Sequence, residues 1–207
     1  MSEPRVIVAV ADQTEDDLIW RRLGDLQTNM FGAGPVAIKF AYFGREGTLP
    51  SRPFISTRWA TDAGDMQALM DHARARCVCG CYVNIGDILV EALKETQQEP
   101  VQAVVIIGDH FHGNRDDAVA FANQLRAAGT RLFLFRQCSR GSAHSDVSRT
   151  LAEKAGGAYF EFNPAVERIA ERLPRLLEAV THYAIGGTDA LEALANQSAG
   201  LLLEQIN

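Results

Sequence analysis

The feature that most constrains the fold is an alternation of short apolar runs with longer amphipathic segments. The strongest run covers residues 101–108, where only Gln102 is polar, and a similar run covers residues 5–11. Runs of this length and composition are typical of strands buried on both faces of a parallel sheet. Apolar residues at helical spacing follow most of these runs. The pattern predicts further strands at residues 36–43, 54–59, 131–135 and 158–162, and helices at residues 16–30, 66–73, 85–93, 118–128, 147–155, 166–183 and 191–202.

The order of these segments predicts a fold class. Strands that alternate with helices form βα units, which build a parallel sheet with helices on both faces. We therefore expect an α/β fold with a doubly wound, mostly parallel central sheet, and residues 54–59 as a short edge strand. Pro174 is expected to kink the helix around it or to start a second helix. Residues 1–186 are expected to form the α/β domain, and residues 187–207 a helical extension that packs on the domain or on a second copy.

Composition narrows the classes of protein to consider. The chain has 207 residues, 47% of them hydrophobic, and a net charge of -6, which excludes a disordered or fibrous chain and disfavours nucleic-acid binding. No apolar run is long enough to cross a membrane. Because the first residues lack a basic stretch followed by a long apolar segment, a cytoplasmic location is expected. The spacing of Cys77, Cys79 and Cys81 differs from the paired pattern of zinc sites, and their role stays open.

Two carboxylates follow the predicted strands that are most apolar. Asp12 comes directly after the first strand and Asp109 directly after the strand at residues 101–108. If these strands are neighbours, both carboxylates lie at the carboxyl edge of the sheet, where open α/β sheets bind ligands. Two carboxylates that share one cleft repel each other unless a cation or proton lies between them, and Mg²⁺ or Mn²⁺ would serve. A second interpretation is that both residues cap the helices that follow them.

The order of the predicted strands and helices, together with the residues that follow them, resembles a von Willebrand factor A (VWA) domain of the intracellular bacterial kind. The resemblance covers residues 4–183. It implies a Rossmann-like sheet with one short antiparallel edge strand, which residues 54–59 could supply. It rests on Asp12 after the first strand, on the segments 84–93, 104–109 and 131–135, and on the Gly156-Gly157 pair before the last strand.

The resemblance also implies a metal-ion-dependent adhesion site (MIDAS) in degenerate form. The family motif D-x-S-x-S corresponds to Asp12, Thr14 and Asp16 in this sequence, and the Asp after the central strand corresponds to Asp109. The family places a Thr just before the helix at residue 85, but Val83 stands there and has no oxygen to offer. The implied ligands of Mg²⁺ or Mn²⁺ are thus Asp12, Thr14, Asp16 and Asp109.

The function that the resemblance implies is protein binding without catalysis. VWA domains mostly bind other proteins, and the metal completes its coordination with a carboxylate of the partner. The expected binding surface is the carboxyl edge of the sheet, with or without the metal. Its partner-binding residues are Tyr82, Asn84, His110 and His112. A homodimer formed through the C-terminal extension is also left open.

An enzymatic alternative is a phosphatase like the haloacid dehalogenases, or another metal-dependent hydrolase. It would use Asp12 as nucleophile together with Asp109. Thr14 stands where these phosphatases need a second Asp, and Lys94, which could bind phosphate, lies inside a predicted helix. His110 and His112 could instead ligate a transition metal. The chain lacks the glycine-rich nucleotide-binding motifs after its first strand.

Overall fold

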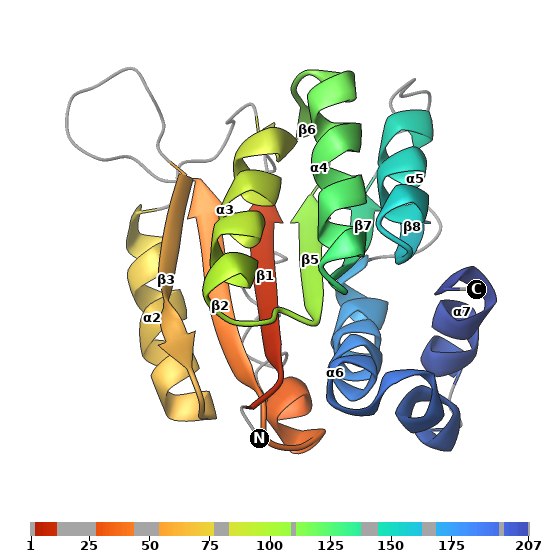
Figure 1. Cartoon of the computed structure of the whole chain (residues 1–207). Helices are drawn as coiled ribbons and strands as arrows, with labels where there is room; N and C mark the ends of the chain where they lie inside the picture. The colour runs from red at the N-terminus through yellow and green to blue at the C-terminus, as the bar shows by residue number, and fades with distance from the viewer. Residues whose placement is uncertain are drawn as a thin grey trace.

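The computed structural model describes residues 3–11, 28–43, 54–76, 83–108, 111–137, 145–162, 169–194 and 197–206. Its main feature is a six-stranded sheet with the strand order β3-β2-β1-β5-β7-β8 (Figure 1). The strands are β1 (Arg5–Ala11), β2 (Ala37–Phe43), β3 (Phe54–Ala60), β5 (Ala103–Gly108), β7 (Arg131–Gln137) and β8 (Ala158–Phe162).

The pairing of the strands confirms the predicted fold class. Strand β1 lies between β2 and β5 and is parallel to both, so that Val6 is in register with Ile38 on one side and Ala103 on the other. Strands β5, β7 and β8 continue the parallel arrangement. Only β3 runs antiparallel, at the edge beside β2. The sheet is therefore mostly parallel with one antiparallel edge strand, as the sequence and the resemblance predict.

Helices cover both faces of the sheet. They are α2 (Ala63–Arg76), α3 (Ile85–Gln98), α4 (Arg115–Ala127), α5 (Ser145–Lys154), α6 (Ile169–Leu194) and α7 (Gln197–Ile206). Helices α3, α4 and α5 line one face, where alternate residues of β1, β5 and β7 such as Ile7, Ile106 and Leu134 are buried against them (Figure 1). Helices α2, α6 and α7 contribute to the core on the other face, with Val8, Val105 and Phe133.

Helix α6 corrects one expectation from the sequence. The helix continues through Pro174, so no second helix starts there. Its non-helical backbone lies instead at Gly186 and Gly187, and Gly187 has a φ of 69°, a conformation that glycine adopts readily. Pro174 is in the second turn of the described part of the helix, where its missing N–H removes one i→i−4 backbone hydrogen bond without ending the helix. The division of the chain at residue 187 stays a prediction.

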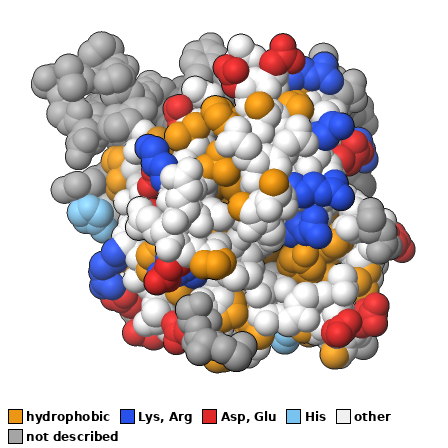
Figure 2. Space-filling view, in the orientation of Figure 1, with side chains coloured by type: hydrophobic (Ala, Val, Ile, Leu, Met, Phe, Trp, Pro, Cys, Tyr) orange, Lys and Arg blue, Asp and Glu red, His pale blue; other side chains and the backbone are white. Residues whose placement is uncertain are grey.

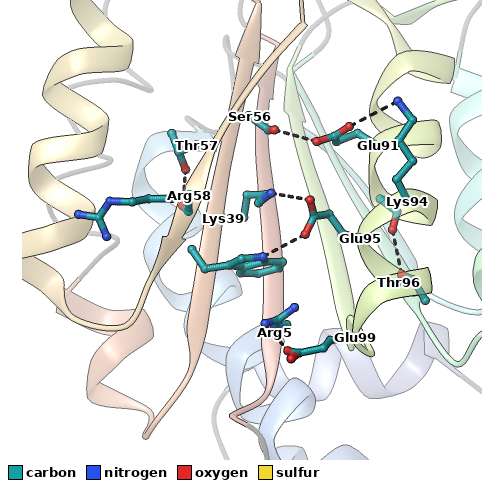
Figure 3. A network of polar contacts seen from close by, with 12 residues as sticks. Arg5, Lys39, Ser56, Thr57, Arg58, Glu91, Lys94, Glu95, Thr96 and Glu99 are labelled. Atoms are coloured by element: carbon teal, nitrogen blue, oxygen red, sulfur yellow. Dashed lines mark hydrogen bonds and ion pairs between the residues drawn. The ribbon is translucent and has the colours of Figure 1, made fainter.

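A network of polar side chains joins edge strand β3 to helix α3 (Figure 3). Glu95 of α3 accepts a hydrogen bond from Lys39 Nζ at 2.6 Å through Oε1, and one from Trp59 Nε1 at 3.0 Å through Oε2. Ser56 donates to Glu91 Oε1 at 2.8 Å. Because Lys39 and Glu95 are both buried, each compensates the charge of the other.

Candidate functional site

Most of the predicted site residues lie outside the part of the chain that the structure describes. These residues are Asp12, Thr14, Asp16, Tyr82, Asp109 and His110, and all four cysteines also lie outside it. Asn84 and His112 are described, in the two short strands β4 (Val83–Asn84) and β6 (Phe111–His112). The described residues therefore show the frame of the predicted site, and the metal ligands themselves stay predictions.

The two strands that lead to Asp12 and Asp109 end side by side. Strands β1 and β5 are parallel neighbours, and their last residues, Ala11 and Gly108, are register partners. Asp12 and Asp109 are the next residues in the sequence. The expectation that the first strand and the central strand are neighbours, on which the idea of a shared cation depends, is confirmed.

A short ladder that the sequence analysis missed joins two loops at this edge. Strand β4, just before α3, pairs in parallel with β6, just after β5, so that Val83 is in register with Phe111 and Asn84 with His112. A ladder of two residue pairs leaves no periodic signal in the sequence, since a strand pattern needs about four residues to be recognised. The ladder brings Asn84 and His112, two predicted partner-binding residues, to adjacent backbone positions.

Asn84 also has a local structural role, because it caps helix α3. Its Oδ1 accepts a hydrogen bond from the backbone N–H of Gly86 at 3.0 Å, and its Nδ2 donates to Asp87 Oδ1 at 3.2 Å. A side chain at Gly113 would come within 2.6 Å of Asn84 Oδ1, and Gly113 has a φ of 135°. Glycine at this position therefore leaves room for the cap. Contact of Asn84 with a partner stays a prediction.

Helix α4 begins at the same edge with a cap of the same kind. Asn114 Oδ1 accepts from the backbone N–H of Asp116 at 2.9 Å and from that of Asp117 at 3.4 Å. Both aspartates are exposed in the first turn of α4, as Asp87 is in the first turn of α3. Carboxylates at these positions stabilise the helix N-termini and give this edge a negative rim.

The phosphatase alternative gains no support from the position of Lys94. This residue is nine residues after the start of α3, about 14 Å along the helix axis from the end that lies at the site. Its Nζ is 3.9 Å from Glu91 Oε2, and the side chain is 64% exposed. Lys94 is thus not in a position to bind a phosphate group held between the ends of β1 and β5.

A second cluster of charged and polar groups lies on strands β7 and β8. Arg136 is fully buried near the end of β7, and Glu161 of β8 is its register partner. Tyr159 donates a hydrogen bond from its hydroxyl to Glu161 Oε2 at 2.7 Å. Burial, together with Glu161, raises the pKa of Tyr159 above its usual range, while Arg136 opposes the shift. The cluster places a buried cation near the carboxyl end of β7.

Among the described residues there is no group of three or more His, Cys, Asp or Glu side chains that could hold a metal ion. A search of the described helices likewise finds none with the length and apolar composition needed to span a membrane.

Comparison of the sequence with protein-family models and with curated proteins finds no match. Solved structures do match the fold. The SpRpn10 VWA domain aligns with a TM-score of 0.60 and 11% identity, over 83% of this chain and 94% of that domain. A von Willebrand factor type A protein from Catenulispora acidiphila aligns with a TM-score of 0.63 and 12% identity, over 89% of this chain and 43% of the other.

A third match is proximal thread matrix protein 1 from the mussel byssus, whose structure has a zinc-occupied MIDAS motif. It aligns with a TM-score of 0.55 and 15% identity, over 86% of this chain and 46% of the other. This chain thus spans less than half of two of these proteins and nearly all of the SpRpn10 domain. The three matches establish that the chain has a VWA-like fold.

Proposed function

We propose that this chain is a protein-binding module whose partner docks at the carboxyl edge of the sheet. The observation that carries the proposal is the convergence of three chain segments at that edge. Strands β1 and β5 end side by side at Ala11 and Gly108, and the β4–β6 ladder holds the loop before α3 against the segment after β5. The VWA-like fold supports the same edge, because the resemblance places the adhesion site there.

In one version of the proposal, a divalent metal takes part in binding. Asp12, Thr14, Asp16 and Asp109 would hold it, and their carboxylate and hydroxyl oxygens are the hard donors that Mg²⁺ and Mn²⁺ prefer. The bound ion would supply a coordination position for a carboxylate of the partner. The described frame fits this version, since β1 and β5 lead Asp12 and Asp109 to the same edge.

In the other version, the partner binds without a metal. Val83 stands where the family has a Thr ligand, so the site lacks one oxygen donor. Binding would then use the loops of the edge through Tyr82, Asn84, His110 and His112. The β4–β6 ladder supports this version as well, because its backbone pairing places Asn84 beside His112.

Calorimetric titration of metal-stripped protein with Mg²⁺ and then Mn²⁺ distinguishes the two versions. The metal version predicts saturable binding that is lost in Asp109→Ala and kept in Asp71→Ala, where an exposed aspartate of α2 is removed instead. An absence of binding to the wild type, or an equal loss in both variants, would contradict the metal version.

Charge reversal at the edge tests partner docking itself. The variant Asp87→Lys/Asp117→Lys changes two exposed aspartates at the starts of α3 and α4, and Asp189→Lys/Glu192→Lys changes two exposed acids on α6 by the same total charge. Partners captured from cell extract by the wild type should bind the α6 variant and fail to bind the edge variant. Equal capture by both variants would place the partner elsewhere, and a dimer mass in light scattering would identify the partner as a second copy.

A further inference from the structure

Two arginine side chains meet over the turn between α5 and β8, at the amino-terminal edge of the sheet. Arg126 belongs to the last turn of α4, and Arg131 is the first residue of β7. A Cβ atom placed on Gly156 would collide with Arg131 Nη1 and would lie 3.6 Å from Arg126 Nε. Both guanidinium groups therefore come within 4 Å of one point. Figure 2 shows Lys and Arg side chains at several heights on the right half of this face, down to the lower ends of α4 and α5.

The backbone of the turn makes this meeting possible. Helix α5 ends in a Schellman motif, in which Gly156 N–H donates to Glu153 O at 3.0 Å and Gly157 N–H to Ala152 O at 2.9 Å. Gly156 has a φ of 67°, which this motif requires. Because glycine has no side chain, the space above the turn is open, and Arg131 occupies part of it.

The groups that bind these two arginines within the described chain are neutral. Arg126 Nη1 donates to the backbone oxygen of Glu153 at 3.5 Å, and Arg131 Nε donates to the hydroxyl oxygen of Tyr183 at 3.1 Å. No carboxylate of a described residue forms an ion pair with either guanidinium. Each guanidinium has five N–H donors, so most of them remain for another acceptor. Tyr183 accepts from Arg131 and can still donate its own O–H.

The charges at this point leave a positive excess. The ends of α4 and α5 each contribute a partial charge of about -0.5, which explains why cations gather there. The two guanidinium groups and Lys154, which is exposed in the last turn of α5, carry three positive charges. They outweigh the two helix ends and the carboxylate of Glu153, which is exposed in the same turn. In a chain with a net charge of -6, this is a local reversal of sign.

We propose that Arg126, Arg131 and Tyr183 form a binding site for a phosphate-type dianion. Two like charges held close together repel each other, and a ligand with nearly two negative charges neutralises both. A phosphate monoester has that charge, and its oxygens match the N–H fork of arginine. The same group occurs on a free phosphate and on a phosphorylated side chain of a protein. The site is at the opposite end of the sheet from the proposed partner edge and does not depend on it.

Titration of the ¹⁵N-labelled chain with inorganic phosphate, at constant ionic strength, tests the site. The Nε–Hε signals of Arg126 and Arg131 should shift along one saturable curve, while chloride leaves them unchanged. Arg126→Gln and Arg131→Gln should each weaken binding about tenfold, because each removes charge-assisted hydrogen bonds to the anion. Tyr183→Phe should weaken binding less, because it removes one neutral donor.

Arg115→Gln is the matched control. Arg115 is exposed at the first turn of α4, about 16 Å along the same helix from Arg126, and its substitution changes the net charge by the same amount. It should leave phosphate binding unchanged. If Arg115→Gln weakens binding as much as Arg131→Gln, the effect is one of general charge and the proposal is wrong. The proposal is also wrong if phosphate causes no saturable shift of the arginine Nε–Hε signals, since the two arginines then only stabilise the helix ends.

A phosphoserine peptide and its unphosphorylated form distinguish the two sources of phosphate. Stronger binding of the phosphopeptide than of inorganic phosphate, lost in Arg126→Gln, would support the site and assign it to a phosphorylated protein. Stronger binding of inorganic phosphate would support the site and assign it to a free phosphate compound. Equal binding of the phosphorylated and unphosphorylated peptides, together with no saturable response to inorganic phosphate, would overturn the proposal. Arg126 is exposed, so its variant is expected to fold even if Arg131→Gln does not.

Discussion

Strands β3 and β8 form the two edges of the six-stranded sheet and are held by different chemistry. Strand β3 is tied to α3 by Glu95, which binds both Lys39 and Trp59. It is also irregular, since its pairing with β2 shifts register and Thr57 Oγ1 accepts the backbone N–H of Phe40 at 3.0 Å. Irregular edges that carry charged residues resist pairing with a further strand.

Strand β8 is covered by a segment from the other end of the sequence. Helix α7 buries Leu202 completely in the core that it shares with α6. Its Gln205 accepts the backbone N–H of Tyr159 at 2.8 Å through Oε1, so a side-chain amide fills a position that a seventh strand would occupy. One edge therefore depends on a buried charge pair and the other on apolar packing. Loss of the one hydrogen bond at the β8 edge should therefore lower the free energy of unfolding less than loss of a partner of the buried ion at the β3 edge.

The largest expected effect is at the β3 edge. Glu95→Ala should lower the free energy of unfolding by about 3–5 kcal/mol, because Lys39 is left as a buried charge with no carboxylate beside it. Urea denaturation measures this. Glu91→Ala, on the same helix, removes a carboxylate that is 22% exposed and should cost about 1 kcal/mol. Equal losses in the two variants would show that burial of the charge does not dominate at this edge.

At the β8 edge, the largest effect should come from an apolar residue. Leu202→Ala should lower the free energy of unfolding by about 2–5 kcal/mol, because it leaves a cavity under α7. The neighbouring Leu201 is partly exposed, and Leu201→Ala should cost clearly less. Thermal and urea denaturation compare the two variants. A similar loss for both would mean that α7 is stabilised by its own helix and not by the core.

The hydrogen bond from Tyr159 to Gln205 should contribute less than either core residue. Gln205→Ala is expected to cost about 1 kcal/mol and to speed hydrogen exchange at the amide of Tyr159. Glu204→Ala, an exposed neighbour on α7, is the control and should change neither quantity. Unchanged exchange at Tyr159 in the Gln205 variant would show that α7 covers the edge without this bond.

The smallest effect depends on alkaline pH. Burial raises the pKa of Tyr159, whereas a tyrosine of the unfolded chain ionises near about pH 10. As pH rises past that value, Tyr159 loses its proton in the unfolded chain before it does so in the folded chain. The contribution of the raised pKa to the free energy of unfolding is therefore complete below about pH 10 and is lost as pH rises above it. The free energy of unfolding of Tyr159→Phe should therefore fall less steeply with alkaline pH than that of the wild type. Parallel slopes would contradict this.

The sequence alone was enough to locate the six strands of the large sheet and the helices that cover it, and to predict that this sheet is mostly parallel, but it missed the two short strands β4 and β6. Apolar periodicity is a local property, so residues 5–11 and 101–108 identify two buried strands without knowledge of their neighbours. The position of Asp12 and Asp109 directly after these strands follows from the same local pattern.

Only the tertiary structure brought together groups that are far apart in the chain. Arg126 and Arg131 meet over Gly156, Gln205 reaches Tyr159, and Glu95 joins Lys39 to Trp59. The β4–β6 ladder is too short to leave a pattern. The physical reason is common to all of them. Hydrogen bonds and ion pairs between distant segments depend on how the layers pack, and hydrophobic periodicity records which face of an element is buried but not which side chains meet there.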